Sequence, residues 1–238
     1  MRKTISIDGK EIPFQEGQTI MDAATEANIY IPHLCHHPDY EPHGSCKLCT
    51  VKVNGRSCTA CTFPAIEGQE IENSSKQLEN DRKRITQMLF VEGNHFCPSC
   101  EKTGNCQLQG VAYHLNMLDN HYPHFFSDRE LDASHADILI DHNRCIFCSL
   151  CVRASQETDG KNVFAISGRG VNKRLIINSA SGNLKDSDIE INDRATHICP
   201  TGAILIKRTG YKVPIGQRTY DQQQIDQVTL NKERDKHD

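Results

Sequence analysis

The sequence predicts an α+β chain made of several small modules rather than one large core. Its 238 residues contain twelve cysteines in three separated groups, whereas only 37% of the residues are hydrophobic and tryptophan is absent. We therefore expect no large continuous apolar core, and the modules need another source of stability. Metal bound only by the folded state could supply it, because its binding energy is then folding energy.

The sequence and its composition also restrict where the protein can be located and which classes of partner it can have. The N-terminus lacks the apolar stretch of a signal peptide, so we expect the cysteines to be reduced in the cytoplasm rather than paired as disulfides. No apolar run approaches the roughly 18 residues of a membrane span. A formal net charge of -4 with interspersed signs argues against nucleic acid. We predict a cytoplasmic protein without membrane or nucleic-acid partners.

The first predicted module, residues 1–77, starts with a hairpin and a helix. Strand-like residues 4–7 and 11–14 flank Asp8-Gly9, which tolerates the positive φ of a tight turn. Thr19 can then cap a helix, with Asp22 three residues later in a capping-box arrangement. A hairpin followed by a packed helix is the start of a β-grasp domain.

Cysteines in this module have the spacing of an iron-sulfur site. Cys35, Cys46 and Cys49 form C-x10-C-x2-C, and a fourth ligand follows a second predicted hairpin. Plant-type ferredoxins have a shorter first gap, C-x4-C-x2-C, but an irregular loop around a [2Fe-2S] cluster can absorb the difference. Cys58 and Cys61 compete as the fourth ligand, and neither spacing nor chemistry decides between them.

A Rieske site is the alternative for this module. Cys35-His36-His37 offers its first half, C-x-H, but the second half should be C-x2-H. The sequence has Cys46-Lys47-Leu48-Cys49 there, with cysteine in place of histidine. The pattern therefore favours four cysteine ligands.

The second predicted module, residues 78–135, is small and helical. Apolar residues recur at helical spacing in a charged segment that Gly93 ends: Leu78, Ile85, Met88 and Leu89.

Three cysteines follow this helix within ten residues, Cys97, Cys100 and Cys106. A four-ligand site is then one ligand short, and His95 is the nearest unassigned residue of a ligating type. Because a histidine beside a metal site often lies outside the ligand set, spacing alone leaves the role of His95 open.

The third predicted module, residues 136–210, carries the most specific motif. Cys145, Cys148 and Cys151 form C-x2-C-x2-C, and Cys199-Pro200 follows far downstream. Three thiolates on one tight turn plus a distant cysteine before proline are typical of a [4Fe-4S] site. Zinc is the main competitor, but zinc sites usually pair two C-x2-C knuckles, which leaves the third cysteine surplus.

This module is expected to hold a single cluster. In two-cluster bacterial ferredoxins the run continues C-x3-C-P, but Ser155 and Gln156 occupy those positions here. Cys199 is therefore expected to close the same cluster. Beyond it, residues 211–238 are polar and charged, as in a flexible or partner-binding tail.

The three cysteine groups, in this order, resemble the N-terminal electron-transfer portion shared by the large iron-sulfur subunit of complex I, iron-only hydrogenases and NAD-linked formate dehydrogenases. Residues 93–102, 106–109 and 145–148 look most like the small diaphorase subunit of NAD-reducing [NiFe] hydrogenases. The resemblance implies a β-grasp [2Fe-2S] ferredoxin-type domain, a [4Fe-4S] domain with one histidine and three cysteine ligands, and a C-terminal ferredoxin-like [4Fe-4S] domain.

The resemblance also implies three ligand sets and leaves Cys58 spare. One departure matters, because the complex I pattern H-x3-C would put the histidine at Gly93, whereas this chain has H-x-C and needs a two-residue deletion. The implied sets are Cys35, Cys46, Cys49 and Cys61 for one [2Fe-2S] cluster; His95, Cys97, Cys100 and Cys106 for a [4Fe-4S] cluster; and Cys145, Cys148, Cys151 and Cys199 for a second [4Fe-4S] cluster.

The function that follows from the resemblance is electron relay. No flavin or nucleotide fingerprint, catalytic nucleophile or nickel site is found, so we predict no catalytic residue and no substrate site. The expected partners are a flavin subunit that carries FMN and handles NAD(H), and the small subunit of a [NiFe] hydrogenase. The alternatives are the same relay in an NAD-dependent formate dehydrogenase or a complex I-like assembly and, from a different class, a zinc-stapled scaffold without redox activity.

Overall fold

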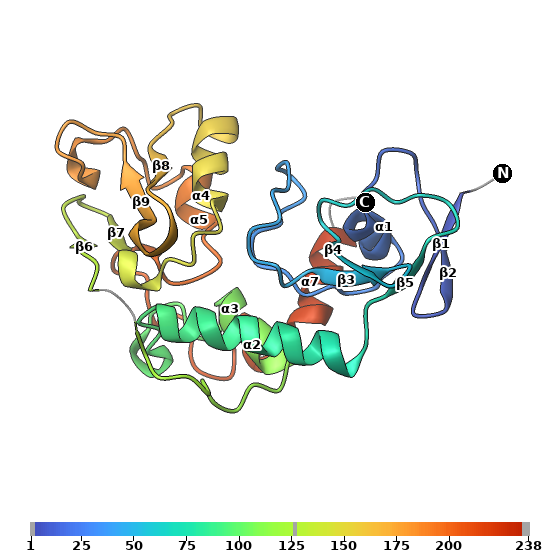
Figure 1. Ribbon diagram of the computed structural model, residues 1–238. Coiled ribbons are helices and arrows are strands. Elements are labelled where there is room, and N and C mark those ends of the chain that lie inside the picture. The colour runs from blue at the N-terminus through green and yellow to red at the C-terminus, as the bar shows by residue number, and fades with distance from the viewer. Residues whose placement is uncertain (1–2, 126–127, 235–238) are drawn as a thin grey trace. The chain divides into compact units, whose positions relative to one another are not determined.

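The computed structural model describes residues 3–125 and 128–234 of the chain (Figure 1). It has two compact units. The first contains residues 1–87, 110–119 and the chain from 223 onward, and the second contains residues 88–109 and 120–222. Helices α2 (Lys76–Glu92) and α3 (Gln107–His114) each pass from one unit into the other. The second unit thus holds most of the second and third predicted modules.

A five-stranded sheet with the order β2-β1-β5-β3-β4 forms the frame of the first unit. β1 and β5 are parallel, and the other neighbours are antiparallel. The strands are β1 (Thr4–Ile7), β2 (Lys10–Pro13), β3 (Thr50–Val53), β4 (Arg56–Thr59) and β5 (Glu70–Glu72). The predicted hairpin is present, with φ of 50° at Asp8 and 80° at Gly9.

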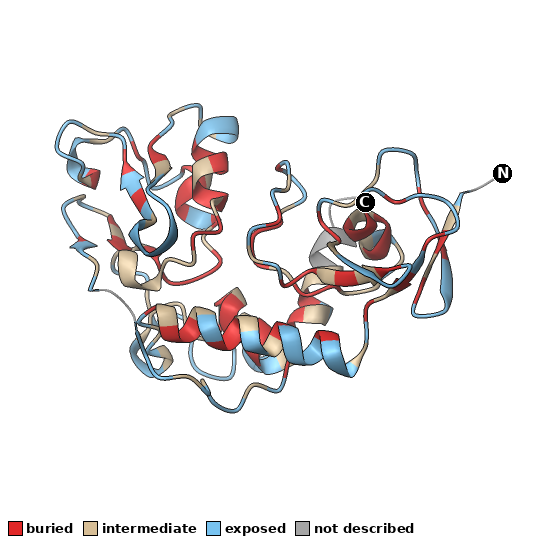
Figure 2. Cartoon of the chain, viewed as in Figure 1, coloured by how far each residue is buried: buried red, intermediate tan, exposed pale blue. Residues whose placement is uncertain are grey.

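Helix α1 (Ile20–Glu26) supplies much of the core of this unit. Thr19 and Asp22 form the predicted capping box, which satisfies backbone N–H groups at the first turn. Alternate residues of β1 and β3 are buried, and Figure 2 shows the buried residues of the helix in red. Fully buried members of the core include Ile5, Ile20, Ala23, Ala24 and Val51. The predicted β-grasp is therefore confirmed.

The second unit contains two small sheets and short helices. β7 (Ile138–Asp141) lies between β6 (Leu131–Asp132) and β10 (Ile204–Ile206), while β8 (Phe164–Ser167) pairs with β9 (Arg174–Ile177). Helix α4 (Leu150–Arg153) continues into a π-helical turn and packs against α5 (Arg194–His197). This mixture agrees with the predicted α+β class.

The C-terminal segment differs from the polar tail expected of its composition. It forms helices α6 (Thr219–Gln222) and α7 (Ile225–Arg234). Ile225 and Val228 of α7 are buried in the first unit, whereas α6 belongs to the second. Two apolar side chains in a charged segment were too weak a signal to predict this packing.

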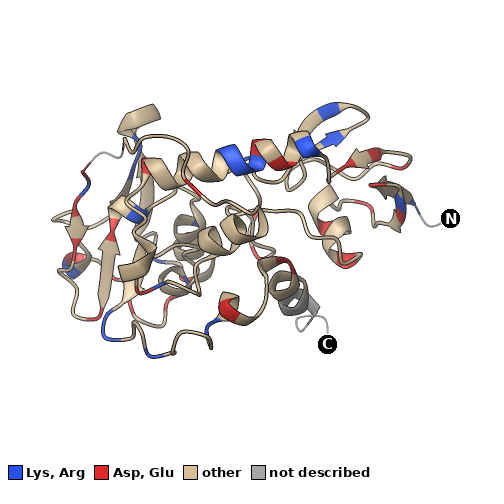
Figure 3. Cartoon of the chain, turned by 90° about the horizontal axis from the view of Figure 1, so that it is seen from below, with Lys and Arg blue, Asp and Glu red and all other residues tan. Residues whose placement is uncertain are grey.

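Basic and acidic residues are interspersed along the chain of each unit, as the blue and red segments of Figure 3 show. None of the described helices combines the length and apolar character needed to traverse a bilayer.

Candidate iron-sulfur sites

Four of the five cysteines of the first unit meet at the end of the β3–β4 hairpin. Cys49 immediately precedes β3 and Cys61 is the second residue after β4, so hairpin pairing brings their sulfurs to 3.3 Å. Cys35 and Cys46 lie on the long loop between α1 and β3, where the Cys46 N–H points to Cys35 Sγ at 3.4 Å. The four thiols thus form two close pairs.

Two pairs of thiols fit a [2Fe-2S] cluster, because each of its two irons takes two protein ligands. Lys47, next to Cys46, has a φ of 57°, a left-handed conformation that turns the loop sharply between Cys46 and Cys49. Strain of this kind is kept only where surrounding structure holds it, and such strain is common at ligand-binding sites.

Within each pair, a hydrogen bond between the two thiols shifts their pKa values in opposite directions. A hydrogen bond from the Cys46 thiol lowers the pKa of Cys35 to about 4, and the same bond raises the pKa of Cys46. In the other pair, the shared hydrogen bond raises the pKa of Cys49 and lowers that of Cys61. Iron binding would displace the protons that remain on the two raised thiols.

Cys58 has a different environment from Cys61. It lies within β4 opposite Val51, three residues before Cys61, and packs half-buried against the core of the sheet. Cys61 is fully buried and its sulfur contacts Cys49. The register of the hairpin therefore brings Cys61, and not Cys58, to the other three cysteines.

The second site is a cavity lined by His95, Cys97, Cys100 and Cys106. A short 3-10 turn over Cys97–Ser99 brings the first two cysteines together, and the Cys100 N–H donates to the Cys97 carbonyl at 3.1 Å. Burial raises the pKa of Cys106 to about 12. Phe90 and Leu108 supply apolar walls.

His95 has the properties of a ligand for this cavity. Burial, followed by the positive charge of Arg144, lowers the pKa of His95 to about 4, so its imidazole is neutral at physiological pH. Its Nε2 is buried and has no hydrogen-bond partner among the described residues. A buried ring nitrogen without a hydrogen-bond partner is costly, and an iron atom bound to the unprotonated nitrogen would satisfy it.

Gly93 provides the space for the His95 ring. A Cβ added at residue 93 would lie only 2.4 Å from His95 Nε2 and 2.9 Å from the Asn143 carbonyl oxygen. The imidazole therefore occupies the space where a side chain at position 93 would begin. This gives a physical account of the departure noted in the sequence, because a histidine two residues later folds back over position 93.

Arg144 lies against the same cavity. Its Nη1 points to Cys100 Sγ at 3.6 Å and pairs with Glu101 at 3.0 Å, while its Nε pairs with Asp141 at 2.9 Å. Hydrogen bonds to a ligand sulfur stabilise negative charge on it and are one of the protein's means of tuning a cluster.

The third site is an apolar cavity lined by Cys145, Cys148, Cys151 and Cys199. Phe147 and Ser149 have φ values of 52° and 59°, and these two left-handed residues wrap the cysteine run around the cavity. Cys199 arrives from the end of α5, which packs on α4. Ser155 does not face the site, since it is buried and its Oγ accepts the N–H of Val163 at 2.8 Å.

Among the described residues, no three His, Cys, Asp or Glu side chains are grouped closely enough to hold one metal ion. Four ligands spread around a cavity instead fit a cubane, in which each ligand binds a different iron.

The second and third sites share one stretch of chain. Pro200, next to Cys199, accepts the N–H of Gln107 at 2.9 Å, and its carbonyl lies 3.7 Å from Cys106 Sγ. Gly202 lines the second cavity, where an added Cβ would lie 2.7 Å from Cys100 Sγ. Residues 199–202 therefore form a short covalent and hydrogen-bonded connection between the two sites.

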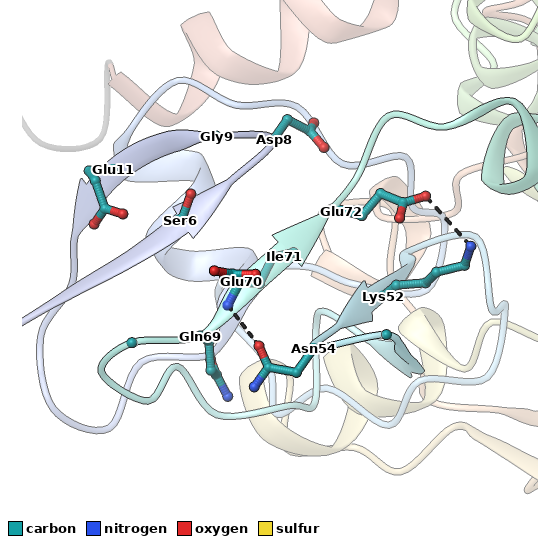
Figure 4. Close-up of a pocket in the computed structure, with 12 residues that line it drawn as sticks. Ser6, Asp8, Gly9, Glu11, Lys52, Asn54, Gln69, Glu70, Ile71 and Glu72 are labelled. Atoms are coloured by element: carbon teal, nitrogen blue, oxygen red, sulfur yellow. Dashed lines mark hydrogen bonds and ion pairs between the residues drawn. The ribbon is translucent and has the colours of Figure 1, made fainter.

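An open hollow on the sheet of the first unit has a different character (Figure 4). It is lined mainly by polar side chains, none of which is a predicted ligand. Lys52 pairs with Glu72 at 3.6 Å, and Asn54 accepts the N–H of Glu70 at 3.0 Å, so these groups are occupied with one another. We assign no chemistry to this hollow.

Sequence reasoning missed three residues that support the sites: Gly93 and Arg144 at the second site, and Arg82, whose buried guanidinium donates to the carbonyls of Leu48 and Thr50 on either side of Cys49. A signal was present for Arg82, which falls between Leu78 and Ile85 on the apolar stripe of α2. An arginine on a buried stripe is unusual enough to suggest a specific role. For Gly93 the signal was that the histidine expected at position 93 stands two residues later, at His95, and for Arg144 it was only the position next to Cys145.

Known families match the chain over three consecutive segments. Residues 2–76 match a 2Fe-2S iron-sulfur cluster binding domain, residues 82–121 match the NADH-ubiquinone oxidoreductase-G iron-sulfur binding region, and residues 138–206 match a 4Fe-4S single cluster domain. The first and third matches agree with the ferredoxin-type domains predicted at the two ends.

Whole-chain relatives are also found. The gamma subunit of the NAD-reducing hydrogenase HoxS of Cupriavidus necator is 41% identical, over 93% of this chain and 94% of that one. The alpha subunit of an NADPH-Fe(3+) oxidoreductase of Geobacter sulfurreducens is 32% identical over 86% of this chain, which spans about a quarter of that relative. A chain in a crystal structure of an NAD+-reducing [NiFe]-hydrogenase in the H2-reduced state matches with a TM-score of 0.90 and 48% identity, covering 92% of this chain and 93% of that one.

Proposed function

The chain belongs to the family of the gamma subunit of NAD-reducing hydrogenase, and from that premise we propose that it relays single electrons through three clusters. The proposed ligands of the [2Fe-2S] cluster are Cys35, Cys46, Cys49 and Cys61. Those of the two [4Fe-4S] clusters are His95, Cys97, Cys100 and Cys106, and Cys145, Cys148, Cys151 and Cys199. The observation that carries the proposal is that each set meets at one cavity or one loop end.

The relay would serve the reaction H2 + NAD+ = H+ + NADH without a catalytic site on this chain. Oxidation of one H2 yields two electrons and two protons, and NAD+ takes up both electrons and one proton. Clusters held entirely by protein ligands have no open position for a substrate, so their chemistry is electron exchange. This chain's residues hold the clusters, exclude water from them and keep their sulfurs in place.

The proposed partners lie at the two ends of this relay. One is a flavin subunit that carries FMN and binds NAD(H), and the other is the small subunit of a [NiFe] hydrogenase. We propose a cytoplasmic location, because reducing conditions keep cysteines available as iron ligands. No disulfide joins any of the twelve cysteines, all of which lie in the described part of the chain.

Iron and acid-labile sulfide in the anaerobically purified chain test the proposal. We expect about ten of each per chain, with one [2Fe-2S] signal and up to two [4Fe-4S] signals in EPR after dithionite reduction. Flavin and hydrogenase subunits should co-purify from cells. Zinc in place of iron, without sulfide, would refute the proposal.

Cys61→Ala and Cys58→Ala form a matched pair that tests the fourth ligand. Cys61→Ala should lower the iron content from about ten to about eight and abolish the [2Fe-2S] signal, because one iron loses a ligand. Cys58→Ala removes a half-buried sulfur outside the site and should leave both readings unchanged. The reverse pattern would make Cys58 the ligand.

A further inference from the structure

Arg82 is a buried cation that is hydrogen-bonded to the chain around Cys49. Only 4% of its surface is exposed, although it lies in the middle of α2. Burying a guanidinium is unfavourable unless its hydrogen bonds and its charge are both compensated. The protein around Arg82 satisfies its hydrogen bonds but does not balance its charge.

The hydrogen bonds of Arg82 are well satisfied. Nε donates to the Leu48 carbonyl at 3.1 Å, and Nη2 donates to the Thr50 carbonyl at 2.9 Å. Two further bonds, of 2.9 and 2.8 Å, reach the backbone and side-chain oxygens of Asn73. The guanidinium therefore holds the backbone on both sides of Cys49, which lies between Leu48 and Thr50.

The charge of Arg82 is not compensated in the same way. All four of these acceptors are neutral oxygens, and no carboxylate lies within ion-pair distance of Arg82 among residues 3–125 and 128–234. Burial lowers the pKa of Arg82. The guanidinium is bonded to the backbone of the two residues that flank Cys49, a proposed iron ligand, so the charge that can balance it is that of the ligand set.

We propose that Arg82 is the counter-ion of the [2Fe-2S] site, raising its reduction potential while it fixes the loop around Cys49. This inference rests on the proposed function. Four thiolates give the site a net negative charge, and a one-electron reduction adds another negative charge. A buried cation nearby stabilises the reduced form more than the oxidised form. Arg82 is therefore a positioning residue that acts through the ligand loop.

Redox titration followed by EPR tests this role in the full-length chain. Arg82→Gln removes the charge and keeps a hydrogen-bonding group, whereas Arg82→Lys keeps the charge and loses the planar fork. For Arg82→Gln we expect the ratio of reduced to oxidised [2Fe-2S] at a fixed potential to fall about tenfold, which is a midpoint about 59 mV lower. Arg82→Lys should stay near the unaltered midpoint.

Two controls separate the charge from general damage. Arg84→Met removes an exposed arginine of the same helix and should leave every midpoint unchanged. The two [4Fe-4S] signals serve as internal standards in each variant. Equal [2Fe-2S] midpoints in the Gln and Lys variants, with iron content intact, would overturn the inference.

If Arg82→Gln loses iron, comparison with Arg82→Lys shows whether the charge or the shape of the side chain is responsible. If only the charged variant retains its [2Fe-2S] signal, the counter-ion role is supported through assembly rather than potential. If both variants lose the signal, the role is structural and the inference fails. Absence of a [2Fe-2S] signal from the unaltered chain would instead refute the proposed function.

Discussion

Gly93→Ala is expected to lower the iron content of the anaerobically purified chain from about ten to about six, through loss of the His95 cubane. The added methyl group would lie 2.4 Å from His95 Nε2 and 2.9 Å from the Asn143 carbonyl oxygen. That oxygen cannot retreat freely, because it accepts the N–H of Asn94 at 2.8 Å. The imidazole must then swing out of the cavity.

Gly210→Ala is the matched control for this prediction. Its added Cβ would lie 2.7 Å from Glu101 Cγ and 2.8 Å from Glu101 Cβ, a similar overlap in the same unit, but Glu101 is not a proposed ligand. We expect about ten irons in the control. Pulsed EPR of the reduced samples should show nitrogen coupling to a cubane in the control and not in Gly93→Ala. Unchanged iron content and nitrogen coupling in Gly93→Ala would contradict the role assigned to Gly93.

Short-range features of the fold were predictable because their causes lie within a few residues. Asp8-Gly9 could be identified as a hairpin turn from its tolerance of positive φ alone. Thr19 and Asp22 could be identified as a capping box because a helix start depends on groups three residues apart. The spacing of Cys145, Cys148 and Cys151 likewise reflects one tight turn.

Long-range features were less accessible. The sequence left Cys58 and Cys61 as competing ligands, because the choice depends on the register of β3 against β4. The approach of Pro200 to Cys106 spans 94 residues, and no local pattern encodes it. The role of Arg82 could not be predicted either, because its hydrogen-bond acceptors come from the loop around Cys49 and from Asn73, and only the folded chain brings them together.

Deletion of residues 211–238 is expected to lower iron from about ten to about six per chain, against the simple expectation for a polar tail. Four hydrogen bonds tie residues 218–220 to the loop between Cys100 and Cys106. Arg218 Nη1 donates to the Thr103 carbonyl, the Thr219 N–H and hydroxyl both donate to Asn105 Oδ1, and the Tyr220 N–H donates to the Gly104 carbonyl.

These bonds hold a loop that turns at Gly104. Gly104 has a φ of 78°, and the Arg218 side chain packs so closely on it that an added Cβ would lie 2.4 Å from Nε. Asp221 holds Arg218 there through contacts of 2.7 and 3.0 Å. At about 1 kcal/mol per hydrogen bond, loss of the clamp removes a large fraction of the few kcal/mol that stabilise a small domain. Cys106 would then be released to solvent.

A shorter truncation after Gln222 separates this clamp from the packing of α7. It keeps Arg218, Thr219 and Tyr220 but removes buried Ile225 and Val228, whose burial contributes about 1.5–3 kcal/mol each. We expect this chain to unfold at a lower temperature while retaining about ten irons. Truncation after Gly210 should lose the cubane signal as well. Because both truncations remove α7, equal iron content in the two chains would show that residues 211–222 do not hold the cluster loop.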